Sequence, residues 1–248
     1  MTAPTILALV RHGESEWMAE HRFQGRGDSP LTATGFRQAN AVGARLAAPA
    51  AAPSIPVPDS PPTAIWHSPL MRATQTAQAI REAREADAPM RPLHDLVELS
   101  QGEWEGLTHD EVRTRYPQQL AAWRDDPLHH QAPGGESLQE ASVRARAARD
   151  TILDRRAAGS STASEAPAEP VLGYADAPGT AVPPAWAIVV AHDGVLRLLM
   201  LDLLGVDLGR FWSFPFALAA ISVLDLGGGL VRLRAHNLAE HVTALARR

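Results

Sequence analysis

The sequence of 248 residues contains neither cysteine nor lysine. Without cysteine, the chain can form no disulfide, no thiol nucleophile and no thiolate metal site. Without lysine, it can form no Schiff base and no phosphate-binding loop that ends in Gly-Lys-Ser/Thr. All 23 basic residues are arginines. These absences remove several common kinds of enzyme site from consideration.

Long apolar segments and an excess of positive charge are also absent. The sequence has no apolar run of about 18 residues, and its first residues do not form a secretion signal. The formal net charge of -5 and the pI of about 6.0 argue against a broad attraction to nucleic acid. We therefore expect a cytoplasmic protein with no nucleic-acid and no membrane partner. A local anion pocket remains compatible with this charge.

Two short apolar runs end directly in segments that contain histidine. The run from Ile6 to Val10 leads into Arg11-His12-Gly13-Glu14, and the run from Trp186 to Ala191 leads into His192-Asp193-Gly194. A continuous apolar run of this length is typical of a strand that is buried on both faces. The pattern predicts that both histidines lie at the carboxyl ends of core strands.

Helix signals lie between and after these strands. Thr32 can cap a helix over residues 33–48, and Thr108 with Glu111 forms a capping-box pattern for another. Further helices are expected from about Ser137 and after Gly194. Helices that alternate with apolar strands predict an α/β fold of three layers, α/β/α, with a mostly parallel central sheet. In such a fold, ligands bind outside the carboxyl ends of the strands, where the two histidines would meet.

The chain is long enough for one sizeable domain or for two small ones, and we interpret residues 1–248 as a single domain. Residues 49–62 are expected to form a loop. Residues 157–184 are rich in Ala, Pro, Gly and Ser, and we interpret them as an insertion within the domain. The segment His67-Ser68-Pro69 marks another junction of strand and helix, with Arg72 in the first turn of the helix.

Five side chains at these junctions suit the chemistry of a phosphate monoester. Such a site needs donors that grip a dianion, a nucleophile in line with the phosphorus, and an acid for the leaving oxygen. The residues that match these needs are Arg11, His12, Arg72, Glu98 and His192. Each of them alone has an ordinary structural explanation, because histidines at strand ends, helix-start arginines and single glutamates are mostly structural or solvated. Only their combination indicates a site.

The wider sequence resembles the histidine phosphatase superfamily, the group that contains the cofactor-dependent phosphoglycerate mutases. The resemblance runs in order through Leu9–Trp17, Arg22–Gly25, Asp28–Thr32, Ser68–Ala77, Glu98–Gly106, Gly134–Ser137, Val190–His192, Asn237 and His241. It covers nearly the whole chain and begins with the Arg-His-Gly signature. It implies a phosphoglycerate mutase-like fold and a reaction that needs neither a metal nor a cofactor.

The resemblance also implies a role for each of the five residues. His12 would attack phosphorus and become a phosphohistidine, while Arg11, Arg72 and His192 would hold the phosphoryl oxygens. Glu98 would give a proton to the leaving alcohol and then act as the base for water. The expected substrate contacts are Arg11, Gly13, Glu14, Ser15, Arg22, Gln24, Gly25, Arg72 and Asp193. Neighbouring guanidiniums should lower the pKa of His12 and keep it neutral, whereas Glu98 must start protonated.

Two positions depart from the family pattern. Met18 stands where many relatives have an asparagine that helps to bind phosphate, so one expected contact is missing or replaced. Asp193 stands where a glycine is common after the second histidine. A carboxylate there would repel phosphate unless it points away or contacts the leaving group.

Three functions are compatible with this sequence. A phosphatase for small phosphorylated metabolites is favoured, because only 135 − 106 = 29 positions separate Gly106 and Gly135. The mutases of the family resemble one another in a longer insertion there, which excludes water from the site. The alternatives are a phosphoglycerate mutase and a catalytically silent phosphate-binding module, although the chain retains the nucleophile and the acid. The wall of the substrate pocket should include residues 22–24, Trp104 and residues 107–133. The sequence does not determine which phosphorylated substrate binds there, or whether the protein is a monomer or a homodimer.

Overall fold

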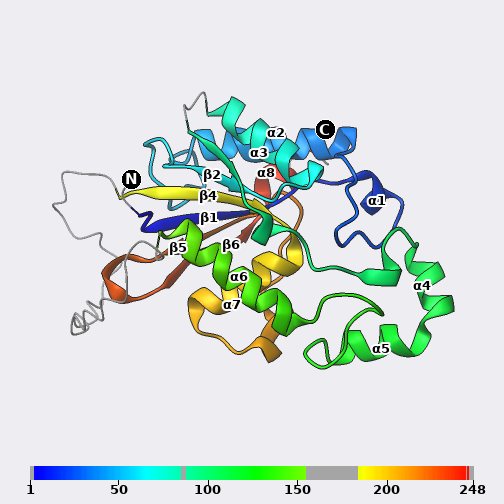
Figure 1. Ribbon diagram of the computed structural model, residues 1–248. Helices are drawn as coiled ribbons and strands as arrows, with labels where there is room; N and C mark the ends of the chain where they lie inside the picture. The colour runs from blue at the N-terminus through cyan, green and yellow to red at the C-terminus, as the bar shows by residue number, and fades with distance from the viewer. Residues whose placement is uncertain (1–2, 85–87, 155–183, 244, 246–248) are drawn as a thin grey trace.

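The computed structural model describes residues 3–84, 88–154, 184–243 and 245, and its core is one six-stranded sheet (Figure 1). The strand order is β3-β2-β4-β1-β5-β6. The strands are β1 (Ile6–Arg11), β2 (Ile65–His67), β3 (Met90–Pro92), β4 (Trp186–Ala191), β5 (Ile221–Asp225) and β6 (Arg232–Leu238). The first four run parallel to one another, whereas β5 pairs antiparallel with β1 and β6 pairs antiparallel with β5. The predicted α/β fold with a mostly parallel sheet is therefore confirmed.

Helices cover both faces of the sheet (Figure 1). On one face lie α2 (Ala33–Ala47), α3 (Met71–Ala83) and the short α8 (Glu240–Thr243), and on the other lie α6 (Leu138–Ile152) and α7 (Asp193–Leu204). Alternate residues of β1 enter different cores, since Leu7 and Leu9 pack on the α6–α7 side while Ala8 and Val10 pack on the α2–α3 side. Burial on both faces explains why the strand is a continuous apolar run.

Three of the predicted helix starts are confirmed by their caps, and the helix expected after Gly194 begins slightly earlier, at Asp193. The Thr32 hydroxyl accepts the Gly35 N–H at the start of α2. Reciprocal capping boxes open α6 at Ser137 and α4 (His109–Arg115) at Thr108. Each cap satisfies backbone donors that have no partner within the helix. Residues 49–62 contain no helix or strand, as expected for a loop.

A smaller layer lies beyond the ends of β1 and β4, at the right of Figure 1. It contains α1 (Glu16–Ala19), α4 and α5 (Pro117–Asp125). Its own apolar cluster is centred on Trp104 and includes Val112 and Leu120. A β-bridge between Arg22 and Thr108 joins the loop after α1 to the start of α4. This layer therefore stands next to the edge of the sheet at which His12 and His192 emerge.

The expected insertion at 157–184 lies outside the described residues except for its last position. The strand that follows it, β4, pairs with β1 from Ile6/Trp186 to Arg11/Ala191. The segments on either side of the insertion thus share one sheet. Strands β5 and β6 and helix α8 were not anticipated from the sequence.

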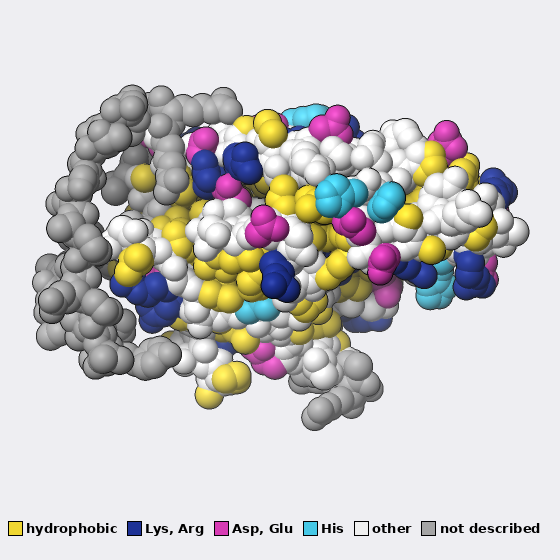
Figure 2. All heavy atoms as spheres, turned by 90° about the horizontal axis from the view of Figure 1, so that it is seen from below, with side chains coloured by type: hydrophobic (Ala, Val, Ile, Leu, Met, Phe, Trp, Pro, Cys, Tyr) yellow, Lys and Arg dark blue, Asp and Glu magenta, His cyan; other side chains and the backbone are white. Residues whose placement is uncertain are grey.

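On the face formed by α6 and α7, charges of both signs are scattered among apolar side chains (Figure 2). None of the described helices is both long enough and apolar enough to cross a membrane.

Candidate active site

The two histidines predicted to meet do lie side by side. His12 follows β1 and His192 follows β4, and these strands are neighbours in the sheet. The ring centroids are 5.0 Å apart with an interplanar angle of 61°. Both side chains are buried. The parallel pairing of the two strands brings together residues that are 180 positions apart in the sequence.

The hydrogen bonds of His12 fix its tautomer. Its Nδ1 lies 2.6 Å from the Gly13 carbonyl, which can only accept, so Nδ1 carries the hydrogen. Its Nε2 accepts the Arg72 Nε–H at 3.3 Å. Burial lowers the pKa of His12 well below its ordinary value, and the charges of Arg72 and Arg11 lower it further. His12 is therefore a neutral imidazole whose Nε2 electron pair faces the guanidinium of Arg72.

Arg72 joins His12 to the loop after α1. The residue lies in the first turn of α3 and is 1% exposed. Its two terminal nitrogens donate to the carbonyls of Gly27 and Gly25 at 2.7 and 2.9 Å. Burial lowers its pKa to about 10, so the guanidinium remains charged near neutral pH. The position predicted for Arg72 at the start of a helix is confirmed.

Arg11 is the last residue of β1 and directly precedes His12. Its Nη1 donates to the Phe216 carbonyl at 2.5 Å. Its Nη2 lies 4.0 Å from the sulfur of Met18, which is only a weak acceptor. Among the described residues, its buried Nε has no hydrogen-bond partner. Arg11 thus has donor capacity left for an anion.

His192 shares a hydrogen bond with Ser68, which was not among the predicted site residues. Its Nε2 lies 2.8 Å from the hydroxyl of Ser68, which follows β2 and is fully buried. Burial and the positive charge of Arg72 lower the pKa of His192 well below its ordinary value. The sequence does contain a signal for Ser68, because it precedes Pro69 at the end of a strand. That junction alone did not predict that Ser68 belongs to the site.

Both carboxylate oxygens of Asp193 are bound by neighbouring groups. Its Oδ1 accepts the Phe216 N–H at 3.2 Å, and its Oδ2 lies 3.0 Å from Arg197 one helical turn further on. Its distance to Arg11 Nη1 is 3.9 Å. Asp193 therefore holds the backbone of Phe216, which in turn accepts from Arg11. Substrate contact by Asp193 stays a prediction.

Glu98 lies at the amino-terminal end of α7, the helix that begins after His192. Its carboxylate accepts backbone N–H groups of Leu99 at 2.9 Å, Gly194 at 3.1 Å and Val195 at 3.1 Å. Burial raises its pKa, and the hydrogen bonds from Leu99 and Gly194 oppose that shift. The raised pKa is the direction expected for a proton donor.

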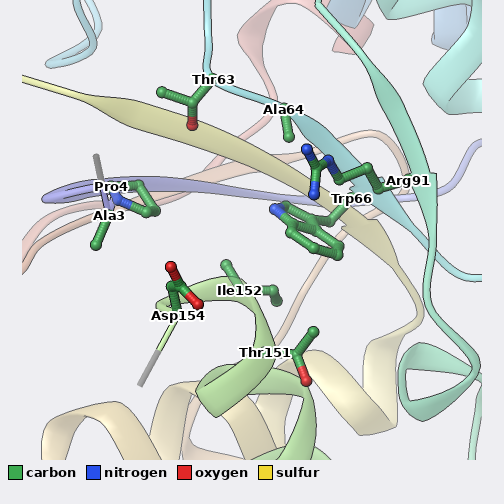
Figure 3. A pocket seen from close by; sticks show the side chains of 9 residues that line it. All are labelled: Ala3, Pro4, Thr63, Ala64, Trp66, Arg91, Thr151, Ile152 and Asp154. Carbon is green, nitrogen blue, oxygen red and sulfur yellow. The ribbon is translucent and has the colours of Figure 1, made fainter. Parts of the chain in front are cut away.

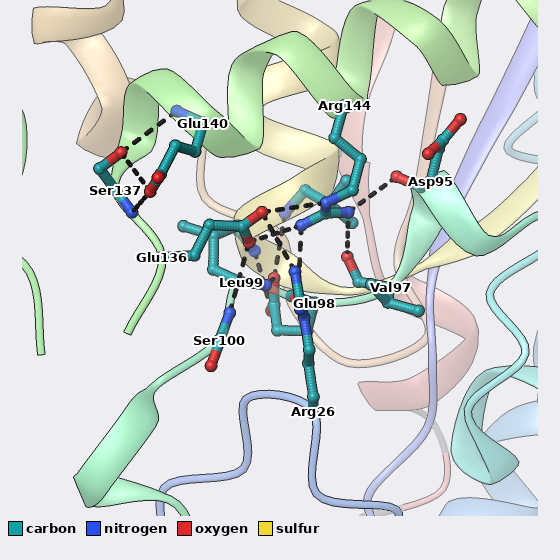
Figure 4. Close-up of polar contacts among 12 residues, drawn as sticks. Arg26, Asp95, Val97, Glu98, Leu99, Ser100, Glu136, Ser137, Glu140 and Arg144 are labelled. Atoms are coloured by element: carbon teal, nitrogen blue, oxygen red, sulfur yellow. Dashed lines mark hydrogen bonds and ion pairs between the residues drawn. The ribbon is translucent and has the colours of Figure 1, made fainter. Parts of the chain in front are cut away.

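The main chain that carries Glu98 is held by Arg144 of α6 (Figure 4). The Nη1 of Arg144 donates to the carbonyls of Asp95 and Val97 at 2.8 and 2.7 Å. The same guanidinium forms a two-point ion pair with Glu136 at 3.1 and 2.8 Å. Arg144 and Glu136 are missing from the expected site residues, because no local pattern connects α6 with residues 95–98.

The other expected substrate contacts are engaged in the loops around His12. The Gly13 N–H donates to Thr76, the Glu14 carboxylate accepts from Thr32, and the Ser15 hydroxyl donates to Gln24. Arg22 donates to the Gly106 carbonyl, and the Gly25 carbonyl accepts from Arg72. Substrate contact by these residues stays a prediction.

Comparison with known proteins agrees with this geometry. The sequence matches the profile of the histidine phosphatase superfamily (branch 1) over residues 7–163 and 178–239. The chain belongs to this superfamily.

Two relatives and one solved structure are similar to this chain over part or most of its length. It is 29% identical to Phosphoserine phosphatase 1 of Hydrogenobacter thermophilus over 223 residues, which is 89% of this chain and 86% of the relative. It is 39% identical over 150 residues to the probable phosphoglycerate mutase GpmB of Salmonella choleraesuis, covering 59% of this chain and 62% of the relative. The structure of Bacillus stearothermophilus YhfR superposes with a TM-score of 0.73 at 28% identity, covering 96% and 98% of the two chains. The family and the similarity to Phosphoserine phosphatase 1 support a phosphatase.

Aromatic side chains connect the smaller layer, which contains α1, α4 and α5, to residues 208–213 after α7. Phe23 packs on Trp104 and Trp104 on Trp123, with ring centroids 5.3 and 5.8 Å apart. Trp123 of α5 meets Trp212 at 5.3 Å. Phe23 and Trp104 belong to the predicted pocket wall, whereas Trp212 was not anticipated. The contact holds α5 against residues 208–213.

Two further observations concern other parts of the molecule. Within the described ranges, no group of three or more His, Asp or Glu side chains is placed to hold a metal ion. A pocket of about 210 Å³ opens at the amino end of β1, between Pro4, Trp66 and Ile152 (Figure 3). The Arg91 guanidinium lies over the Trp66 ring in this pocket, 5.3 Å from its centroid. None of the five predicted catalytic residues, Arg11, His12, Arg72, Glu98 and His192, lines this pocket.

Proposed function

We propose that this protein is a phosphatase that hydrolyses phosphate monoesters of small metabolites through a phosphohistidine at His12. The observation that carries the proposal is the orientation of His12. Its Nδ1–H is bound to the Gly13 carbonyl, and its Nε2 electron pair faces the guanidinium of Arg72. A neutral imidazole held among cations is a suitable nucleophile for a phosphoryl group.

In the first step, Nε2 of His12 attacks phosphorus and the bond to the ester oxygen breaks. Arg11, Arg72 and His192 hold the phosphoryl oxygens, and the two guanidiniums offset their charge as the bond order changes. Protonated Glu98 gives its proton to the leaving oxygen, so that a neutral alcohol departs. The products of this step are the alcohol, phosphohistidine and the Glu98 carboxylate.

In the second step, water attacks the phosphohistidine. The Glu98 carboxylate accepts a proton from that water, the bond between phosphorus and Nε2 breaks, and inorganic phosphate leaves. Both catalytic residues then return to their starting protonation states. The three backbone N–H groups around Glu98 support the carboxylate that exists between the two steps.

Arg11 and Arg72 supply the positive charge for this mechanism, so we expect no need for a metal ion. Release of phosphate from p-nitrophenyl phosphate should continue in the presence of a chelator. Complete dependence of the rate on an added divalent metal would contradict the mechanism.

The nucleophile is tested by trapping the intermediate. Rapid acid-free quenching of the enzyme with radiolabelled substrate should reveal an acid-labile phosphoenzyme, and His12→Ala should abolish it. His129→Ala is a suitable control, because the His129 side chain is 68% exposed and pairs with Asp126. A label that persists in His12→Ala would place the nucleophile elsewhere.

The acid is tested with two kinds of leaving group. Glu98→Gln should slow hydrolysis of an alkyl phosphate by about 10²–10⁴-fold, because an alkoxide leaves poorly without a proton. The loss should be much smaller for p-nitrophenyl phosphate, whose leaving group needs no proton. Equal losses on both esters would reject Glu98 as the acid.

A phosphoglycerate mutase is the second candidate, because the chain is similar to the probable mutase GpmB over 150 residues. Such an enzyme would use the same phosphohistidine but return the phosphoryl group to its substrate. The segment between Gly106 and Gly135 holds only the short helices α4 and α5, which favours access of water. Interconversion of phosphoglycerates that outpaces release of phosphate would favour the mutase.

A further inference from the structure

The carboxylate of Glu98 rests against the first turn of α7. The N–H groups of Gly194 and Val195 both donate to it, at 3.1 Å each. Because these are the first donors of a helix of 12 residues, they have no partner within α7. The acid and His192 are therefore both located by the start of the same helix.

The close approach of Glu98 depends on a missing side chain at residue 194. A Cβ on Gly194 would lie 2.7 Å from Glu98 Oε1 and 2.8 Å from Leu99 Cδ1. Contacts this short are not tolerated, so any other residue at this position would move the carboxyl group. Gly194 does not have a positive φ, and its position is helical. The need for glycine here is thus one of space and not of backbone conformation.

We propose that Gly194 is a positioning residue that admits the Glu98 carboxyl group to the start of α7 and so sets its place for proton transfer. The inference rests on the proposed function, in which Glu98 is first the acid and then the base. The proposal also explains why glycine follows Asp193, because a side chain at position 194 would meet the Glu98 carboxyl group.

Displacement of the carboxyl group has two chemical consequences. The proton moves away from the place where the leaving oxygen would lie, which slows the reaction only for esters that need that proton. The carboxylate also loses N–H donors that favour its charged form, so the pKa of Glu98 rises further. The charged groups that face Glu98 are unchanged by this substitution, namely Arg72 from α3, Asp193 from α7 and Arg144 from α6.

The substitution Gly194→Ala should leave the fold intact. The nearest atom to the new Cβ is the end of a flexible side chain, which can rotate away. Alanine also has less conformational freedom than glycine in the unfolded chain, which favours the folded state at a position with helical φ. The expected result is an enzyme with an unchanged or higher Tm and a defect confined to proton transfer.

The experiment compares two esters in the full-length protein. One is p-nitrophenyl phosphate and the other is the alkyl phosphate that the unaltered enzyme hydrolyses fastest in a panel of phosphorylated metabolites. Gly194→Ala should lower kcat/KM for the alkyl ester by about 10-fold or more and change it little for the aryl ester. The pH at which alkyl ester hydrolysis declines on the alkaline side should move upward, because that decline follows deprotonation of Glu98.

Two further variants make the result decisive. The double variant Gly194→Ala/Glu98→Gln should be no slower on the alkyl ester than Glu98→Gln alone, because both changes act through one carboxyl group. Leu199→Ala, a core change one turn further along α7, should lower Tm while keeping the ratio of rates on the two esters.

Three outcomes would overturn the proposal. Gly194→Ala could match the unaltered enzyme on both esters, it could slow both esters equally with no shift in the pH profile, or its effect could add fully to that of Glu98→Gln. In each case the proposed phosphatase function would stand if Glu98→Gln still discriminates between the esters. Loss of that discrimination would instead overturn the assignment of the acid, and this inference with it.

Discussion

Removal of the Arg144 guanidinium should destabilise the protein by a measurable amount. Arg144→Met keeps the length of the side-chain stem but removes its bonds to the Asp95 and Val97 carbonyls and its two-point pair with Glu136. Both members of the ion pair have side chains that are only 11% exposed. Solvent therefore replaces little of what the substitution removes.

The size of this destabilisation depends on the interactions that the partners of Arg144 keep after the substitution. Loss of one member of a buried ion pair costs about 3–5 kcal/mol when the other charge is left unpaired. Here Glu136 keeps a second partner, since Arg26 lies 3.1 Å from its Oε1. The two freed carbonyls each lose a bond to a charged donor, worth about 1.5–3 kcal/mol before water replaces it. We expect the free energy of unfolding to fall by about 3 kcal/mol, which leaves a typical domain folded.

The assay is urea denaturation, with Arg146→Met as the matched control on the same helix. The Arg146 side chain is 53% exposed and pairs with Asp202, so its loss should cost less than about 1 kcal/mol. A double-mutant cycle with Glu136→Gln should give a coupling energy of about 1 kcal/mol or more. The reasoning would be refuted if Arg144→Met cost no more than Arg146→Met, or if the two changes at the pair were additive.

Three further changes have defined outcomes. Arg72→Lys keeps a charge but cannot bond two glycine carbonyls while it faces His12, so kcat/KM should fall by about 10–100-fold for alkyl and aryl esters alike; a loss on one ester only would contradict this role. The free energy of unfolding should decrease as pH falls below 6.5, because unfolding releases neutral His12 and His192 from their lowered pKa values and lets them take up protons. His192→Gln should weaken that dependence in urea titrations between about pH 7 and pH 5, and an unchanged slope would show that His192 does not contribute. Trp123→Ala should lower the unfolding free energy by about 1–3 kcal/mol through loss of two aromatic contacts, and should do so less in a Trp212→Ala background.

Local patterns in the sequence were enough to predict much of the fold. The apolar run before His12 predicts a strand buried on both faces, and Leu7 and Ala8 do enter different cores. The Thr32 cap and the Thr108–Glu111 box depend on residues within one turn of each other, and both form as predicted. Strands β5 and β6 were missed, because antiparallel pairing at the edge of a mostly parallel sheet is decided by distant partners.

The sequence by itself also determined which side chains are available for chemistry. It placed His12, Arg72 and His192 at junctions between elements, where a parallel sheet brings such residues to one edge. It could not determine their hydrogen bonds. The choice of Gly13 as partner for His12 Nδ1 depends on side-chain orientation, which a strand-and-loop pattern does not encode.

Only the tertiary structure decided how each group is oriented and charged. The carboxylate of Asp193 is oriented by Phe216 and Arg197, which bind its two oxygens. Glu98 sits on the start of α7 because residue 194 has no side chain, although 96 positions separate the two residues. Contacts of this kind depend on packing between elements that are remote in the chain. A pKa shift depends on burial and on neighbouring charges in space, so it takes its value only when those elements have come together.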